Sequence, residues 1–159
     1  MSAADRIRLT TAAALVIALA FVWLSVRLRG RGARRLLLIA SLAGVLWFTV
    51  LGKTPGTRSV NLTPLWSWAL WDQIDVRHPI LQNVLLFVPF GAALRAAGIR
   101  HPILLAALTS AAVEALQFVF ALGLCETDDV IHNTLGAALG VGLFCLGEHL
   151  TRPDGRKRS

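Results

Sequence analysis

The sequence predicts an all-α integral membrane protein, a bundle of about five transmembrane helices with an interfacial segment after the second. Three observations support this prediction. Hydrophobic residues make up 55% of the 159-residue chain, charged residues only 16%, and the mean hydropathy is +0.63. Globular proteins average about 45–50% apolar and about 25% charged residues. This composition excludes a disordered chain and argues against an ordinary soluble enzyme.

Five apolar runs account for the predicted helices, since a span needs about 17–25 residues. They cover residues 9–26, 36–52, 79–94, 102–125 and 130–147. The first run also fits a secretory signal, but it continues past the cleavage pattern at residues 18–20, which favours a span. The third run spans only if it extends to about residue 98, so a four-span alternative stays open.

The segment at residues 61–71 is too short to span and carries Trp66, Trp68 and Trp71. Tryptophan collects at membrane interfaces because its ring is apolar and its N–H needs a polar partner. We therefore expect this segment to lie on the membrane surface, packed against its neighbours.

Basic residues predict the orientation, because cytoplasmic loops carry an excess of Lys and Arg. If the spans alternate, eleven lie on one side: Arg27, Arg29, Arg31, Arg34, Arg35, Arg95, Arg100, Arg152, Arg156, Lys157 and Arg158. Five lie on the other: Arg6, Arg8, Lys53, Arg58 and Arg77. We expect a multi-pass protein of the cell membrane with its N-terminus outside and its C-terminus in the cytoplasm. The net charge of +7 then reflects topology, and nucleic acid is not an expected partner.

The chain divides into three parts by composition. Residues 1–35 form an N-terminal span and an Arg-rich cytoplasmic loop, residues 36–147 form the main transmembrane domain, and residues 148–159 form a basic cytoplasmic tail.

Polar residues inside the apolar runs are the candidate functional residues. A charge at the centre of a spanning helix costs about 2.5–3.5 kcal/mol and often has a function. The spacing places Glu114 near the middle of the fourth span, and it and Asp129 are the candidates for acid/base catalysis. The candidate binding residues are Asn61, Asn83, Glu114, Gln117, Asp128, Asp129 and Asn133. The structural alternatives are interhelical hydrogen bonds for the amides and a solvated or capping role for the aspartates.

One face of the fifth span carries polar residues followed by glycines. Asp129, Asn133, Gly136 and Gly140 follow at steps of three and four. Small residues at i and i+4 let helix backbones approach closely. We expect Gly136 and Gly140 to mark where this helix packs on another, with Asp129 and Asn133 turned inward.

Three motifs together resemble a known family. Residues 83–91 read N-x-x-x-F-x-P-F-G, residues 114–117 read E-x-x-Q, and residues 128–136 read D-D-x-x-x-N-T-x-G. With the N-L-x-P-L stretch at 61–65, they resemble the VanZ-like membrane proteins over roughly residues 36–147. The founding members are associated with resistance to teicoplanin-type lipoglycopeptides through the cell envelope, so the resemblance implies a role there. Many members carry an arginine before the aspartates. Here residues 123–125 read G-L-C in that stretch, and Arg58 and Arg77 are the candidates for the missing cation.

The favoured hypothesis is a binding or modulating protein whose outward-facing polar cavity holds the head group of a cell-envelope lipid or wall precursor. Expected partners are membrane lipids and a lipid-linked cell-wall precursor or a lipoglycopeptide. The alternative is a membrane-embedded enzyme acting on a lipid-linked substrate, with Glu114 and Asp129 as acid and base. A third hypothesis is a transporter or flippase component in which Glu114 relays a proton. Neither a cofactor nor a metal site is predicted. Asp128 and Asp129 are the only weak candidates for binding a hard cation.

Overall fold

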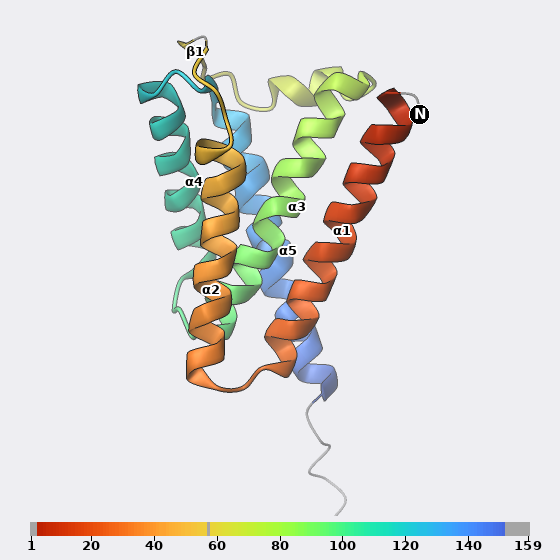
Figure 1. Cartoon of the computed structure of the whole chain (residues 1–159), viewed down its shortest axis with the longest axis vertical. Helices are drawn as coiled ribbons and strands as arrows, with labels where there is room; N and C mark the ends of the chain where they lie inside the picture. Colours follow the sequence, from red (N-terminus) through yellow and green to blue (C-terminus); the bar gives the residue numbers. More distant parts are fainter. Residues whose placement is uncertain (1–2, 57, 152–159) are drawn as a thin grey trace, which may run out of the picture.

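The computed structural model describes residues 3–56 and 58–151. Five long helices run side by side: α1 (Ala3–Arg27), α2 (Arg31–Leu46), α3 (Ile74–Ala96), α4 (Pro102–Val119) and α5 (Thr127–Thr151) (Figure 1). The π-helix η1 (Trp47–Leu51) continues α2. All five helices, with η1 counted as part of the second, are long and apolar enough to cross a membrane. The chain is therefore a helical multi-pass membrane protein, and the prediction of five spans is confirmed. Residues 152–159 of the predicted basic tail lie outside the described residues.

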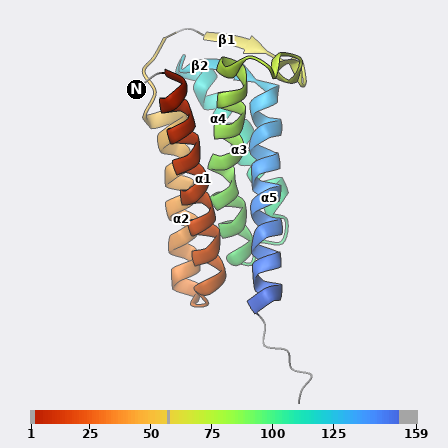
Figure 2. The same ribbon diagram turned by 90° about the vertical axis from the view of Figure 1, so that its right-hand side faces the viewer.

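The segment between α2 and α3 lies across one end of the bundle (Figure 2). It contains strand β1 (Arg58–Asn61) and the 3-10 helix η2 (Trp66–Leu70). Strand β1 pairs in parallel with β2 (Gly123–Glu126), the short strand between α4 and α5, in a register that aligns Asn61 with Glu126. Parallel pairing of two four-residue strands was not predicted. We call this end, which also carries the start of α1, the strand end of the bundle.

The fourth helix ends at Val119, six residues before the predicted end at residue 125. Its C-terminus closes with paired hydrogen bonds, from the Leu122 N–H to the Gln117 carbonyl (2.8 Å) and from the Ala121 N–H to the Phe118 carbonyl (3.2 Å). Ala121 takes the left-handed conformation (φ 53°) that this closure requires. Glu114 therefore lies about one and a half turns from the strand end of its helix, rather than near the middle of the span as predicted.

The third helix begins at Ile74, five residues before the predicted start at residue 79. Its first turn carries Asp75, which favours a helix N-terminus because the helix dipole is positive there. The hydropathy run missed this turn because Asp75, Arg77 and His78 interrupt its apolar residues. At the other end, Gly98 takes a positive φ (81°) and closes α3 in the same way as Ala121 closes α4.

The contact between α3 and α5 brings the two backbones together at glycines. A Cβ added at Gly136 would lie 2.1 Å from the Val84 carbonyl oxygen, and one at Gly140 would lie 2.0 Å from the Val88 carbonyl oxygen. Gly91 of α3 meets the backbone of α5 just as closely. The prediction that Gly136 and Gly140 mark a helix contact is confirmed, and the partner is α3.

Buried apolar side chains pack on both sides of α3. One cluster joins α1, α3 and α5: Ala18, Val22, Val26, Val88, Ala92, Ala96 and Phe144. The other joins α2, α3, α4 and α5: Val45, Phe87, Phe90, Leu94, Ala106, Val113 and Ala137. Because α3 takes part in both, it is the central helix of the bundle.

Arg34 connects α2, α3 and α5 at the end of the bundle opposite the strands. Its guanidinium donates to the carbonyl oxygens of Leu28 and Ala96, each at 3.0 Å, and pairs with the Glu148 carboxylate at 3.6 Å. One residue of the Arg-rich loop therefore has a structural role in addition to the topological one expected of the loop.

Gly136→Ala is expected to destabilise the bundle, because its methyl group cannot fit against the Val84 carbonyl without moving a backbone. Overpacking of this kind costs about 1–3 kcal/mol. Gly142→Ala is the matched control, since nothing lies within 4 Å of a Cβ there and alanine is the better helix former. The thermal-unfolding midpoint in detergent should fall for Gly136→Ala and stay level or rise for Gly142→Ala. Equal midpoints for the two variants would show that the close contact is unimportant.

Candidate functional site

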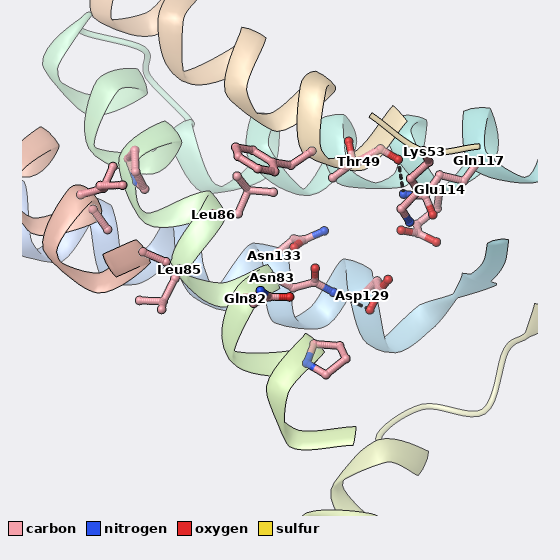
Figure 3. Close-up of a pocket in the computed structure, with 16 residues that line it drawn as sticks. Thr49, Lys53, Gln82, Asn83, Leu85, Leu86, Glu114, Gln117, Asp129 and Asn133 are labelled. Carbon is pink, nitrogen blue, oxygen red and sulfur yellow. Dashed lines mark hydrogen bonds between the residues drawn. The ribbon is translucent and has the colours of Figure 1, made fainter. Parts of the chain in front are cut away.

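A cavity of about 410 Å³ lies among all five spans toward the strand end. Its polar lining consists of Thr49, Lys53, Gln82, Asn83, Glu114, Gln117, Asp129 and Asn133 (Figure 3). Its apolar lining comes from Ala14, Ile17, Ala18, Phe48, Leu85, Leu86, Pro79 and Pro89. Five of the predicted binding residues therefore meet around one space, although they come from three helices; Asn61 and Asp128 do not line it.

Asn61 has a local role away from the cavity. It is the last residue of β1, and its side-chain oxygen accepts a hydrogen bond from the Thr63 N–H at 3.1 Å. Such a bond stabilises a turn, here the turn that leads toward η2.

Asp128 anchors residues 61–71, here called the surface segment, to α5. Its side chain is 1% exposed and accepts hydrogen bonds from the N–H groups of Leu65 and Ser67 and from the Ser67 hydroxyl. Leu65 has a left-handed backbone (φ 59°), which is costly for a residue other than glycine and persists where surrounding contacts hold it. The alternative that Asp128 is a solvated turn residue is wrong.

His132, one turn along α5, makes a second connection to the same segment. The Trp68 Nε1–H donates to His132 Nε2 at 2.8 Å, and the two rings lie nearly parallel. Because Nε2 accepts, the neutral imidazole carries its proton on Nδ1. Asp128 and His132 together hold η2 on the end of α5.

Glu114 joins the wall of the cavity to strand β2. Its side chain is buried, and Oε2 accepts a hydrogen bond from the Glu126 N–H at 3.0 Å. Asp129, facing the same cavity from α5, accepts a hydrogen bond from Asn83 Nδ2 at 2.7 Å. Each of these two carboxylates is thus fixed by one partner and also faces the cavity.

Lys53 is the basic residue that lines this cavity, as far as the described residues extend. It lies close enough to interact electrostatically with Glu114 and Asp129. Neither of the two candidate arginines, Arg58 and Arg77, lines the cavity. Arg58 instead donates to the Val119 carbonyl at 2.8 Å, where a helix C-terminus leaves carbonyls unpaired.

The three amides bridge elements, as the structural alternative predicted. Gln117 Nε2 donates to the Thr49 carbonyl at 3.0 Å, and Asn133 Nδ2 donates to the Ser110 hydroxyl at 2.9 Å. Asn83 makes the bond to Asp129 described above. In each case the N–H group is used within the protein, so the carbonyl oxygen is the free end of the amide.

Sequence reasoning missed three groups that shape this site. Lys53 follows the second span directly and resembles an ordinary flanking cation. The Thr49 carbonyl is available because it lies in the last turn of its helix. Ser110 precedes Glu114 by one turn on α4, and this i, i+4 spacing was the one signal in the sequence that could have found it.

The motifs on this site belong to a described family. A family profile described as VanZ/LLP1 matches residues 35–148, which is most of the chain. The chain belongs to the VanZ/LLP1 family. It is also 33% identical over 93 residues to Protein VanZ of Enterococcus faecium, a match that covers 56% of this chain and 54% of that protein. The chain therefore spans about half the length of the curated relative. No solved structure matches it.

Glu126 is predicted to make the folding stability of this VanZ/LLP1 chain depend on pH. Burial and the nearby Asp129 carboxylate raise the pKa of Glu126 from its usual 4.5 to about 7. Between pH 4.5 and 7 the folded state then binds more protons than the unfolded state, so stability falls as the pH rises through that range.

Glu126→Gln is expected to reduce this loss of stability, because the amide does not ionise. The thermal-unfolding midpoint of the wild type should fall by several degrees between pH 5 and pH 8, and that fall should be smaller for Glu126→Gln. Asp72→Asn, at an exposed carboxylate, is the control and should keep the wild-type fall. An equally large fall in Glu126→Gln would show that ionisation of Glu126 does not cause the loss of stability.

Proposed function

We propose that this VanZ/LLP1 chain binds the head group of a cell-envelope lipid or lipid-linked wall precursor in its polar cavity. The supporting observation is that the cavity is lined both by buried polar side chains and by exposed apolar ones. Ile17 of α1 and Phe48 of η1 both line it and are 65% and 69% exposed. Exposed apolar side chains on membrane-spanning helices face hydrocarbon, so the cavity opens sideways to the acyl region. Such an opening suits an amphiphile, with its head inside and its chains in the bilayer.

The proposed orientation places the cavity in the outer half of the membrane. The polar lining lies toward the strand end. Residues 126–129, which include three acidic residues, and the tryptophan-bearing residues 61–71 lie at the same end. The excess of Lys and Arg at the opposite end supports a cytoplasmic location for that end, because cytoplasmic loops are enriched in basic residues. By its resemblance to VanZ-like proteins, the chain would act on the envelope and change sensitivity to teicoplanin-type lipoglycopeptides.

Blocking the opening is the direct test of binding. Ala14→Trp introduces a large ring where α1 lines the cavity, whereas Ala13→Trp places the same ring on the adjacent exposed position. A steric cost of about 1.4 kcal/mol weakens binding about tenfold. Native mass spectrometry should show about tenfold less retained envelope lipid for Ala14→Trp and no change for Ala13→Trp.

Equal lipid retention in the two tryptophan variants would contradict binding in this cavity. Turnover of the retained lipid, lost in Glu114→Gln, would instead favour the enzyme hypothesis, in which Glu114 and Asp129 act as acid and base. This second candidate is kept because both carboxylates face one cavity.

Cysteine labelling in intact cells tests the orientation. In a background with Cys125 and Cys145 replaced by serine, Ser59→Cys reports on the strand end and Gly30→Cys on the loop between α1 and α2; both positions are exposed. A membrane-impermeant thiol reagent should label residue 59 and not residue 30. The reverse pattern would place the cavity toward the cytoplasm and contradict a role in the outer leaflet.

A further inference from the structure

The cavity has hydrogen-bond acceptors that no protein donor satisfies. Gln117 Oε1 and Asn133 Oδ1 are buried without a hydrogen-bond partner, and both side chains are only 2% exposed. For Gln117 the assignment of oxygen and nitrogen is unambiguous, because its other end contacts the Thr49 carbonyl, which only accepts. A buried acceptor left without a donor is costly, so these two oxygens are suited to a ligand that brings N–H or O–H groups.

The charge of the lining favours a ligand that carries a positively charged group. Glu114 and Asp129 face the cavity as carboxylates, and Lys53 is the cation beside them among the described lining residues. When both carboxylates are ionised, two negative charges and one positive charge face the same space, so a positive group on the ligand is attracted to the carboxylates and a negative group to Lys53.

Lys53 also has a position suited to a second part of the ligand. It lines the cavity and is exposed, while the two unpartnered amide oxygens are buried. An ammonium head among the carboxylate and amide oxygens would leave a phosphodiester near Lys53, which binds phosphate as a point charge. The apolar chains would then leave between Ile17 and Phe48.

We propose that the cavity selects an amphiphile whose head group carries a primary ammonium joined through a phosphodiester to apolar chains. The ammonium N–H groups donate to Gln117 Oε1, Asn133 Oδ1 and the Glu114 and Asp129 carboxylates. This inference rests on the proposed function, since it names the class of head group that the cavity takes. An aminophospholipid and an amine-bearing lipid-linked precursor share this chemistry.

Chain-matched phospholipids test the selection on the wild-type protein. The purified chain is exposed to dioleoyl phosphatidylethanolamine, its N-monomethyl and N,N-dimethyl derivatives, phosphatidylcholine and phosphatidylglycerol, and retained lipid is measured by native mass spectrometry. Retention should fall along the methylation series as N–H donors are lost, with about a tenfold preference for the primary amine over phosphatidylcholine. Phosphatidylglycerol, which offers hydroxyl groups and no positive charge, should be retained as poorly as phosphatidylcholine. Competition by a soluble amine-bearing precursor head group distinguishes the two sources.

Asp129→Asn provides the matched variant, since it removes one of the two carboxylate charges and keeps an oxygen acceptor. It should lose most of the preference for phosphatidylethanolamine, whereas Asp72→Asn, at an exposed position away from the cavity, should keep it. Thermal-unfolding midpoints measured without lipid show whether both variants fold.

Other outcomes overturn the inference in distinguishable ways. Equal retention of all the lipids, abolished by Ala14→Trp, would leave the proposed function standing and refute selection of an ammonium. Preference for phosphatidylglycerol would show recognition of hydroxyl groups instead. Stabilisation by Ca²⁺ alone, reversed by a chelator and without selective lipid retention, would show a divalent cation at these oxygens. Retention of no lipid at all would refute the proposed function as well.

Discussion

The close contact between α3 and α5 is the constraint on which the rest of the structure depends. Without a driving force from water, helices in a membrane associate through packing and interhelical hydrogen bonds, and small residues let their backbones meet. Gly136 and Gly140 provide this approach against the Val84 and Val88 carbonyls. Asn83, next to Val84, then lies within 2.7 Å of Asp129 on the facing helix. The distance between the two backbones thus sets the geometry of the polar cavity.

Amide side chains serve two purposes in this arrangement. A membrane interior offers no water to satisfy polar groups, so each N–H must find a protein partner. Gln117 and Asn133 do so through Thr49 and Ser110, which fixes both side chains in place. Their oxygens are consequently oriented before any ligand arrives, and a ligand need not bear the entropic cost of ordering them.

Hydropathy was sufficient to predict the helices, because apolar runs of this length have few other stable conformations. It was less informative at helix ends. Asp75, Arg77 and His78 lie at the start of α3, and Ala121, rather than a glycine, closes α4. The pairing of β1 with β2 depends on where α4 ends, so no local pattern reports it. In the site, the spacing of Glu114, Gln117, Asp129 and Asn133 correctly placed them on common faces. Lys53 was missed because its role depends on the path of the chain after η1.

Asp128 and Asp129 are neighbours in the sequence that face different surroundings. The first is enclosed by Leu65 and Ser67 of the surface segment, while the second faces the cavity beside Asn83. A genetic screen that replaced the pair together would therefore confound two phenotypes, a displaced surface segment and an altered cavity lining. Single replacements separate the two phenotypes, and only replacement of Asp129 changes a group that lines the cavity. For the same reason, a homologue that kept just one aspartate would be expected to retain one of these two properties and lose the other.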